Sequence, residues 1–442
     1  MTEKNDEEEE LNRFEDKIKQ LYNYRDSYFI TEPEESFSAK NANVDKKVDE
    51  LFKEFNSKIN LNKISDKANY YYLKGWLLNI KNDYDKEVFD LLTKSIKLRP
   101  NYSVAWIELG ECYFKKGDLK LALNCFETVL KQNPKEKKAL RYASIMLRSL
   151  PWSTPDEKKQ NVIKSIDLAK KALECDLSDG QSWAVLANAY LTFAFMTNRM
   201  EHNSLTKNCK SAYQKAIMID KNVATKADVL FNYASILQYE EEFEEALTCL
   251  VNASKYDPEW RELVQRKQNL ISFFNDICHK ITETSNLSGK KLNSLRDRCR
   301  SDEEKLRKQY ANNLEMCNGQ TKQLEQLVDG PNECLLVCKV QSYTSDIHNI
   351  FYCSVLNVID SNGNNMAIFI YDIINGRGPK SGDSIVVIRP VVKAHHIRYD
   401  GNEYRFRVIK ISKPLHELYV NNRRIGVDCL SIPIINVTLK SD

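Results

Sequence analysis

The sequence predicts a multidomain α+β protein, in which an all-α superhelix of paired helices precedes a small all-β barrel. The first observation is a repeat: residues 103–134 carry small and large apolar residues at the spacing of a helical hairpin, and looser copies lie on both sides. The second observation is that the apolar period changes to strict alternation near residue 333. A chain of 442 residues has room for two or three such domains.

Composition and charge exclude several classes of protein. The formal net charge is only +3, so the chain as a whole is not a polycation built for nucleic acid. Its 12 cysteines are scattered without a CxxC pair, which predicts a reducing compartment and no disulfide framework. The start, MTEKNDEEEE, is too acidic for a signal or transit peptide, and no apolar run approaches the roughly 20 residues of a membrane span. We therefore expect a cytoplasmic protein with a nuclear pool and no membrane partner.

Residues 103–134 carry the clearest copy of the repeat. The pattern is that of a tetratricopeptide repeat (TPR): W-x2-L-G-x2-Y on the first helix, A-x3-F on the second and a closing proline. Small residues at Gly110 and Ala122 let the two antiparallel helices approach closely, while a large side chain such as Phe126 fills the gap between successive hairpins. Pro134 ends the second helix, because proline cannot continue it. We expect this segment to be one hairpin of a stack.

Further copies of the hairpin give the domain organisation. Five copies can be recognised, which is more than the three or so that such a stack needs. The strand-like runs after residue 333 are separated by turn signals such as SNGN and YDGNE, and they favour a small barrel of the OB type. The expected parts are an acidic disordered N-terminus (1–10), a TPR superhelix with N-terminal helices and a capping helix (11–284), a charged helical linker (285–332), an OB-fold domain (333–430) and a tail (431–442).

The sequence offers no catalytic constellation. It lacks a P-loop, a dinucleotide-binding glycine motif, a zinc-protease motif and a nucleophile elbow, so we predict no enzyme, no cofactor and no metal site. The adjacent pair His395–His396 lies near a predicted strand end. Neighbouring strand residues face opposite sides, so we expect a structural or surface role for this pair rather than a shared metal.

The candidate binding residues lie on the first helix of each hairpin, because these helices line the concave face of a TPR superhelix. On that face the repeat register places Arg141 and Arg148 in the third hairpin, Asn188 in the fourth, and Asp228 and Asn232 in the fifth. A pair of asparagines at these two positions is typical of peptide-binding TPR proteins, because an amide offers both a donor and an acceptor to an extended main chain. The alternative is that both are ordinary polar helix residues.

The charges on the same face are of both signs. Arg148 could bind a carboxylate with two hydrogen bonds, while Asp228 and Glu262 could hold a cation or a free amine. Each charge alone is equally compatible with a solvated helix face. Together they predict a groove for a peptide that carries both a positive and a negative residue, and the groove positions Val104, Ile107, Glu111 and Phe114 add a mostly apolar end. Ala184 replaces the cation that a clamp for a chaperone-tail carboxylate would need, so we disfavour that ligand.

At these residues the chain resembles the tetratricopeptide repeat protein 5 family, also called Strap. The resemblance covers nearly the whole chain and rests on QLYNYRDSYF, LGECYFKKGD, SIMLRSL, DGQSWAVLANAYL and VIDSNGNNMAIFIYDI, followed by GDSIVV and the closing LYVNN. It implies an adaptor that binds the N-terminal Met-Arg-Glu-(Ile/Cys) peptide of nascent α- and β-tubulin at the ribosome exit. The family then recruits an adaptor and a deadenylase complex, which triggers tubulin mRNA decay. Members also act as nuclear cofactors of a histone acetyltransferase in stress and p53 responses.

The resemblance also assigns roles to residues. It places the family's groove arginine on Arg148, its groove acids on Asp228 and Glu262, and a family asparagine on Asn188. It further implies contact with ribosomal RNA through basic residues after the capping helix, which here are Lys290, Lys291 and Arg296. One family lysine falls on Ser288, so the ribosome contact is the part of the resemblance that this sequence matches least.

An alternative function places the nucleic-acid contact on the β-domain. OB barrels bind single strands through aromatic and cationic side chains. The candidates for such a surface are Arg398, Tyr399, Tyr404, Arg405, Phe406 and Arg407. Alternation along the strand puts Tyr404 and Phe406 on one face and the two intervening arginines on the other. The same pattern also fits a core face and a solvent face.

Overall fold

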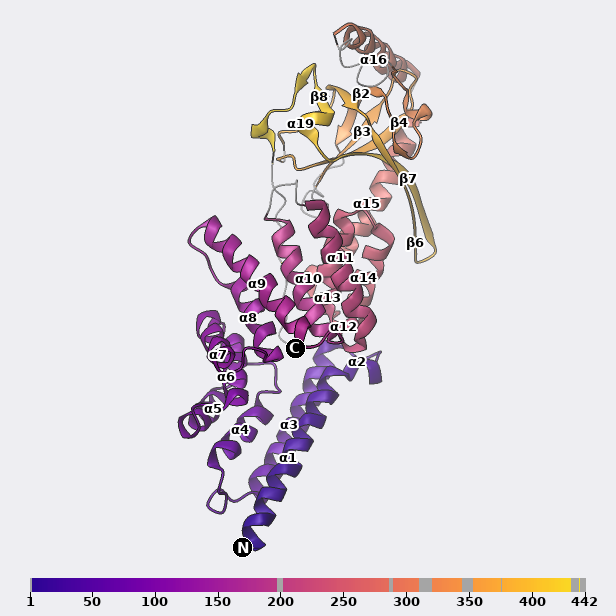
Figure 1. Cartoon of the computed structure of the whole chain (residues 1–442). Helices are drawn as coiled ribbons and strands as arrows, with labels where there is room; N and C mark the ends of the chain where they lie inside the picture. The colour runs from indigo at the N-terminus through magenta and orange to yellow at the C-terminus, as the bar shows by residue number, and fades with distance from the viewer. Residues whose placement is uncertain are drawn as a thin grey trace. The chain divides into compact units, whose positions relative to one another are not determined.

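The computed structural model divides the chain into two compact units (Figure 1). The structure describes residues 2–196, 202–285, 289–309, 320–343, 353–374, 376–430 and 437. The first unit comprises Met1–Ile236, Cys249–Leu263 and Ile435–Asp442, and the second comprises Leu237–Thr248 and Val264–Ile434. Within the described residues, no helix combines the length and the apolar character that crossing a bilayer requires.

The first unit is built from paired helices, as the repeat pattern predicts. Four successive hairpins pair α4 with α5, α6 with α7, α8 with α9 and α10 with α11. The helices of this unit are α1 (Thr2–Asp26), α2 (Tyr28–Thr31), α3 (Phe37–Lys58), α4 (Lys67–Leu78), α5 (Lys86–Leu98), α6 (Ser103–Lys116), α7 (Leu119–Gln132), α8 (Lys137–Ser149), α9 (Pro155–Cys175), α10 (Gly180–Ala194), α11 (His202–Ile219) and α12 (Lys221–Ala224). Three more helices, α13 (Ala227–Tyr239), α14 (Phe243–Tyr256) and α15 (Arg261–Ser285), contribute residues to both units.

Local capping chemistry explains where the hairpin helices begin and end. The side chains of Asp66, Asp85 and Asp118 accept hydrogen bonds from backbone N–H groups in the first turns of α4, α5 and α7. These aspartates satisfy donors that have no partner within the helix. Helix α6 ends at Gly117, whose φ of +85° is a left-handed conformation that glycine adopts without strain.

The packing inside the α6–α7 hairpin depends on the absence of a side chain at Gly110. A Cβ atom built at this position would lie 2.6 Å from the ring of Phe126, which is fully buried and stacks on Tyr142 with centroids 5.1 Å apart. Ala122 on the facing helix is also fully buried. The small residues of the repeat pattern therefore do set the approach of the two helices, as the sequence predicts.

We predict that Gly110→Ala destabilises the first unit by about 1–3 kcal/mol, because the added methyl group must push the Phe126 ring out of a packed site. Urea unfolding of the full chain measures this cost. The matched control is Gly110→Ala combined with Phe126→Leu, which should cost less than the sum of the two single changes. Full additivity would contradict the steric explanation.

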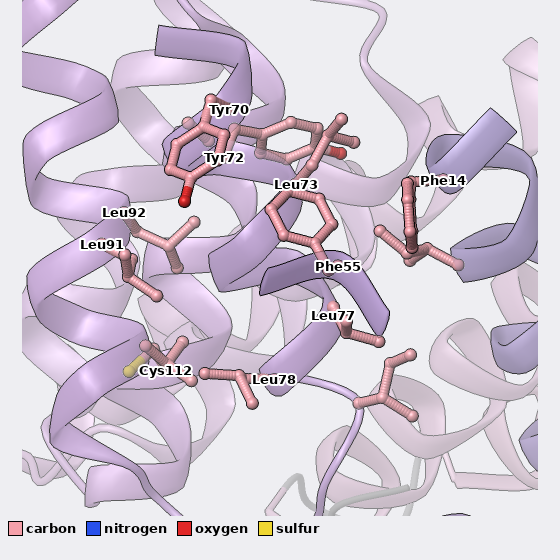
Figure 2. Packing of buried hydrophobic residues seen from close by; sticks show 14 of the residues in the cluster. Phe14, Phe55, Tyr70, Tyr72, Leu73, Leu77, Leu78, Leu91, Leu92 and Cys112 are labelled. Atoms are coloured by element: carbon pink, nitrogen blue, oxygen red, sulfur yellow. The ribbon is translucent and has the colours of Figure 1, made fainter. Parts of the chain in front are cut away.

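The N-terminal helices pack as a further helix pair against the first hairpin. Figure 2 shows Phe14 of α1 and Phe55 of α3 facing the apolar side chains of α4 and α5. The rings of Phe14 and Phe55 are in edge contact at 5.0 Å, and both are fully buried. This cluster fixes α1 on the hairpin array.

Residues 1–10 were predicted to be disordered, but in the structure α1 begins at Thr2. Glu9 and Glu10 are one turn before Arg13 and form ion pairs with it at 2.9 and 3.1 Å. Leu11 is 2% exposed. The acidic composition of residues 1–10 predicted a solvated, disordered tail. In the structure the segment is helical, because ion pairs with Arg13 and the burial of Leu11 stabilise the first turns of α1.

The second unit contains a nine-stranded sheet with the strand order β1-β6-β7-β4-β3-β2-β5-β8-β9. The predicted all-β region is confirmed. Neighbouring strands are antiparallel, except that β4 and β7 are parallel. The strands are β1 (Gly330–Pro331), β2 (Leu335–Tyr343), β3 (Cys353–Ile359), β4 (Asn365–Tyr371), β5 (Ser384–Ile388), β6 (Val391–Tyr399), β7 (Asn402–Ile411), β8 (Leu418–Val420) and β9 (Arg423–Arg424). One predicted run, DSIVVIRPVVKAHHI, is divided into β5 and β6 at Arg389, whose φ is +52°.

Two helices that were expected outside the β-domain lie in the second unit, α16 entirely and α15 from Val264 onwards. The segment predicted as a linker forms α16 (Gly289–Gln309), on which Cys299 is buried and Asp302 pairs with Lys339 of β2 at 2.8 Å. On α15, expected to cap the repeats, Phe274 packs on Tyr404 of β7 with ring centroids 5.4 Å apart. The charged composition of this segment suggested a solvated linker. Instead, Cys299 and Asp302 anchor α16 on the second unit.

The turn before α14 carries a buried carboxylate that the second unit surrounds with cations. Glu241 accepts a hydrogen bond from the Tyr371 hydroxyl at 2.7 Å and lies 3.0 Å from the Lys410 ammonium. Lys393 and His395 each approach its carboxylate to 3.7 Å. Burial alone would raise the pKa of Glu241, but the nearby His395, the two lysines and the Tyr371 hydroxyl lower it to about 2. The ionised carboxylate therefore stabilises this unit.

We predict that Glu241→Gln costs about 3 kcal/mol at pH 7, which corresponds to the fall of the pKa from 4.5 to about 2. A carboxylate with a lowered pKa in the folded state stabilises the fold above its unfolded pKa. Its contribution is lost as the pH falls from 4.5 towards 2. Urea unfolding of the full chain at several pH values tests this, with Glu240→Gln as the matched control. A cost that does not change with pH would contradict it.

Candidate peptide-binding cavity

A cavity of about 120 Å³ lies in the first unit, among the first helices of successive hairpins. This is the face that the repeat register predicts as the groove. Its walls come from α6 (Glu111, Phe114, Lys115), α8 (Arg141, Tyr142, Ile145), α10 (Gln181, Ala184, Val185, Asn188), the α12–α13 region (Val223, Lys226, Asp228, Val229) and Arg25 of α1. Four of the predicted binding residues therefore line one cavity: Glu111, Arg141, Asn188 and Asp228.

The acidic wall at Glu111 is part of a buried charge network. Glu111 and Glu108, one turn apart on α6, are 7% and 3% exposed. The Lys138 ammonium of α8 lies between them, 2.5 Å from Glu111 Oε1 and 2.9 Å from Glu108 Oε1. Asn79 Nδ2 also donates to Glu108 Oε2 at 2.8 Å. Two buried carboxylates thus share one ammonium.

Burial would raise the pKa of both glutamates, and the outcome differs between them. For Glu108, burial and the nearby charge of Glu111 leave the pKa above its ordinary value. For Glu111, the field of Lys138 outweighs burial, so the pKa is lowered and the side chain is a carboxylate at neutral pH. The two carboxylates likewise outweigh burial at Lys138 and raise the pKa of its ammonium. The cavity wall therefore carries a negative charge at Glu111.

Cations on the cavity wall have partners beside them. Arg141 is held by Asp179 at 2.6 Å, and Arg25 by Asp26 at 2.7 Å. Lys115 donates to the backbone carbonyl of Asn79 at 2.5 Å, and burial lowers the pKa of its ammonium. These three side chains are therefore committed within the protein, although their positive ends line the cavity.

Arg148 differs from these cations. Its Nη1 donates to Ser144 Oγ at 3.1 Å, to Ser165 Oγ at 3.2 Å and to the carbonyl of Val185 at 3.5 Å. Its Nη2 is buried without a hydrogen-bond partner, and no carboxylate lies in ion-pair range among the described residues. Burial lowers the pKa of the guanidinium to about 10, so it remains charged at neutral pH. Arg148 does not itself line the cavity but lies behind Val185, which does.

The two predicted asparagines have different positions. Asn188 lines the cavity, whereas Asn232 is fully buried and donates through Nδ2 to Asn188 Oδ1 at 3.3 Å. The hydroxyl of Tyr213, on α11, donates to the same oxygen. The sequence predicted that both asparagines face the ligand, but the structure places one of them behind the other.

The remaining predicted residues lie away from the cavity. Glu262 is exposed in the first turn of α15 and does not line the cavity. Lys290 and Lys291 belong to α16, and their side chains lie outside the described part of the structure. Arg296, on the same helix, is half-exposed in the second unit.

Sequence reasoning missed the contribution of α1 and of second helices. The periodicity of α1 indicates only an amphipathic helix, so nothing in it pointed to Arg25 as a cavity residue. Tyr22, one turn earlier, stacks on Trp76 of α4 with centroids 5.2 Å apart and donates to Glu108 Oε2 at 3.3 Å. Tyr213 lies on the second helix of its hairpin, whereas the repeat register assigns groove positions to first helices only.

The β-domain residues proposed for nucleic-acid binding show the core-and-surface arrangement. Tyr404 and Phe406 are buried, at 6% and 5% exposure, and both rings pack on Phe274. Arg405 is exposed and pairs with Glu403 at 2.8 Å, and Arg407 pairs with Asp329 at 3.0 Å. These two aromatic rings are therefore occupied within the unit and cannot stack on bases.

The fold and the cavity define a class: a tetratricopeptide protein with a cavity of mixed charge in its helical unit and a strand-rich C-terminal domain. Residues 103–136 match the family model for the tetratricopeptide repeat. Residues 318–433 match the model described as the tetratricopeptide repeat protein 5 OB fold domain, which begins before the boundary at 333 that the sequence suggested.

Relatives extend this match to the whole chain. Tetratricopeptide repeat protein 5 of Homo sapiens is 31% identical over 432 residues, which is 95% of this chain and 96% of the relative. The protein of the same name from Mus musculus is 32% identical over 420 residues, or 93% of each chain. A solved tetratricopeptide protein from Thermus thermophilus is similar over 46% of this chain and 98% of its own, at 14% identity and a TM-score of 0.38. The chain belongs to the tetratricopeptide repeat protein 5 family.

Proposed function

We propose that this protein is a non-enzymatic adaptor that binds the N-terminal Met-Arg-Glu-(Ile/Cys) peptide of nascent α- and β-tubulin at the ribosome exit and triggers co-translational tubulin mRNA decay. Membership of the family and its TPR and OB domains support an adaptor role. The finer proposal rests on the charges of the cavity. The observation that carries it lies beside the cavity: Arg148 is a half-buried cation whose Nη2 is buried and which has no carboxylate partner among the described residues.

An unpaired buried charge is costly, and it is retained where a ligand supplies the counter-charge. Arg148 Nη1 donates to two serine hydroxyls and to the carbonyls of Ser144 and Val185, and these hydrogen bonds orient the guanidinium. Its Nη2 is buried and has no acceptor among the described residues. A carboxylate such as the peptide's glutamate would complete the site, and a guanidinium binds that group with well-defined geometry.

The acids of the cavity suit the positive end of the same peptide. Asp228 of α13 and Glu111 of α6 both line the cavity, and Glu111 is ionised at neutral pH. We assign them to the peptide's arginine and its free amine, with Glu262 as a further acid outside the cavity. Phe114, Ile145 and Val229 supply apolar wall for an Ile or Cys side chain.

Downstream steps follow from the family. We propose that Lys290, Lys291 and Arg296 on α16 contact ribosomal RNA, a contact carried mostly by charge. The bound complex then recruits an adaptor and a deadenylase complex in the cytoplasm, and a nuclear pool serves the histone acetyltransferase role.

A direct binding assay tests the proposal. We expect fluorescence anisotropy with a labelled Met-Arg-Glu-Ile peptide to show saturable binding to the full chain. The reordered peptide Met-Glu-Arg-Ile should bind far more weakly. Asp228→Asn should weaken binding by at least about tenfold, in the range for removing one charge of a buried pair. Glu127→Gln, which changes an exposed acid on α7, is the matched control. Equal binding of the two peptides would refute the proposal.

A further inference from the structure

One edge of the β6–β7 hairpin in the second unit is open along most of its length. β6 pairs with β7 over the whole of Val391–Tyr399, but on its other side it pairs with β1 at Val391 and Val392 only. Within the described residues no other strand lies on that side, and Figure 1 shows the hairpin extending beyond the neighbouring strands. We call residues 393–399 the open edge.

A buried amide ends β1 and so leaves this edge open. Asn332 is 2% exposed, its Oδ1 accepts from the N–H of Val328 at 3.0 Å, and its Nδ2 donates to the carbonyl of Val328 at 2.8 Å. The register of β1 would otherwise place Val328 opposite Ala394. Because Asn332 binds both backbone groups of Val328, β1 does not continue along β6.

The turn of the hairpin determines which backbone groups face the open edge. Asp400 and Gly401 join the two strands, and their φ angles of +49° and +74° are those of a two-residue turn that closes on a hydrogen-bonded pair. Hydrogen-bonded and non-hydrogen-bonded pairs alternate along an antiparallel ladder. The N–H and C=O groups of Ala394, His396 and Arg398 therefore point away from β7, and the described residues supply no partner for them.

The side chains at the open edge border a cavity on one face of the sheet. Ala394 and His396 line a cavity of about 810 Å³ in the second unit, together with Arg405 and Arg407 of β7. In an added strand, the residues opposite Ala394 and His396 would direct their side chains to the same face, because directly opposed residues share a face. A strand bound at this edge therefore places every second side chain beside the cavity.

The charges on this hairpin are mostly positive. Residues 391–411 carry five Lys or Arg and two Asp or Glu, and one of these acids, Glu403, already contacts His396 and two arginines. Glu325 is the one acid among the described residues that line the cavity. A second copy of the hairpin would be repelled by the like net charge, and the aromatic rings of β7 that could stack on bases are buried. The charges favour an acidic peptide.

We propose that the open edge of β6 binds an extended acidic segment of a partner protein as an added antiparallel strand, in line with β1. The outward backbone groups of Ala394, His396 and Arg398 form the main-chain hydrogen bonds, and the cationic face selects acidic side chains at every second position. Seven strand residues span about 23 Å, so a peptide of that length covers the edge. This site lies in the second unit and does not depend on the function proposed above.

Backbone N-methylation of a peptide tests the strand pairing directly. The probe is labelled acetyl-Thr-Glu-Val-Glu-Val-Glu-Thr-amide, and its binding to the full chain is measured by fluorescence anisotropy. Its glutamates should lie opposite the three outward edge residues and exchange hydrogen bonds with them. N-methylation of the three glutamates should weaken binding at least about tenfold, whereas N-methylation of the valines and the last threonine should change it less than about threefold. Equal losses would refute the pairing.

A proline at the open edge tests the same hydrogen bonds from the side of the protein. Ala394→Pro should weaken binding of the probe at least about tenfold, because proline lacks the outward N–H and its ring blocks the edge. Ala394→Val is the matched control, since it keeps the N–H, and it should bind like the wild type. Normal binding by Ala394→Pro would contradict the proposal. Thermal melting of both variants separates a loss of binding from a loss of fold.

The charge preference has its own test. Arg398 has a side chain that is 71% exposed, and Arg398→Gln should weaken binding of the acidic probe about threefold, as expected for a surface ion pair. Arg423→Gln is the control, because Arg423 is an exposed arginine of β9, at the other end of the sheet. A probe with lysine in place of glutamate should bind far more weakly. Equal binding of the two probes would overturn the acidic preference.

The other occupants give distinct results. A dimer that Ala394→Pro abolishes, without binding of the probe, would assign the edge to a second copy of the chain and overturn the proposal. Binding of polyuridine without binding of the probe would assign the face to nucleic acid and overturn it as well, as would no saturable binding of the probe at all. If Ala394→Pro does not fold, the N-methylated peptides with the wild-type protein still decide the question.

Discussion

Replacing Arg148 by methionine is expected to weaken peptide binding by at least about thirtyfold. The free energy of unfolding of the first unit should stay within about 1 kcal/mol of the wild-type value. Arg148 is a half-buried cation with a buried Nη2 and no carboxylate partner among the described residues, and burial of its guanidinium lowers its pKa to about 10. Replacing a buried charge by an apolar side chain of similar size is often neutral or stabilising. Ser144 and Ser165 remain bonded to each other, with Oγ atoms 3.1 Å apart.

Peptide anisotropy and urea unfolding of the same preparation test this prediction. Binding should fall by at least about thirtyfold, which corresponds to 2 kcal/mol for a buried charge pair. Arg13→Met is the control, because Arg13 is an exposed arginine of α1 outside the cavity. A variant that binds normally, or one that loses several kcal/mol of stability, would show that Arg148 is a structural residue.

Replacing Lys138 by methionine should have the opposite effect on stability. We predict a loss of about 3–5 kcal/mol, because Glu108 and Glu111 would remain buried without their shared ammonium. Without that ammonium, burial and mutual repulsion raise the pKa of both glutamates in the folded state. The variant should therefore regain stability as the pH falls from 7 towards 5, since the folded state then takes up protons that the unfolded state does not.

Urea unfolding at pH 7 and pH 5 measures this effect. The matched control combines Lys138→Met with Glu108→Gln and Glu111→Gln, which removes the charges together and should recover much of the loss. A cost below about 1 kcal/mol would contradict the buried network, since that is the usual range of a surface ion pair. A cost that is the same at both pH values would also contradict it.

The repeat spacing made much of this architecture predictable. Small residues such as Gly110 recur where two helices touch, and the resulting register predicts Asn188 and Asp228 on the cavity face, where both lie. The alternation after residue 333 likewise predicted the strands, because side-chain direction alternates in a sheet. The repeat spacing and the strand alternation are both local, periodic patterns, so they can be recognised in the sequence without knowledge of distant contacts.

The misplaced elements are those whose position depends on distant partners. Helix α16 is charged along most of its length, yet a few residues such as Cys299 and Asp302 tie it to the second unit. The contribution of Arg25 requires knowing that α1 contacts α4 and α6, which its own periodicity does not specify. The sequence equally could not show that Asn232 supports Asn188, because both occupy groove positions of their repeats.

The central claim is that Arg148, a half-buried cation of the first unit, binds the carboxylate of the peptide's glutamate. The most direct measurement is a double-mutant cycle between the protein and the ligand. The wild type and Arg148→Met are each titrated with Met-Arg-Glu-Ile and with Met-Arg-Gln-Ile. We predict a coupling energy of about 2–4 kcal/mol between Arg148 and the peptide's glutamate. A coupling energy below about 0.5 kcal/mol, with both peptides binding the wild type equally well, would contradict the claim.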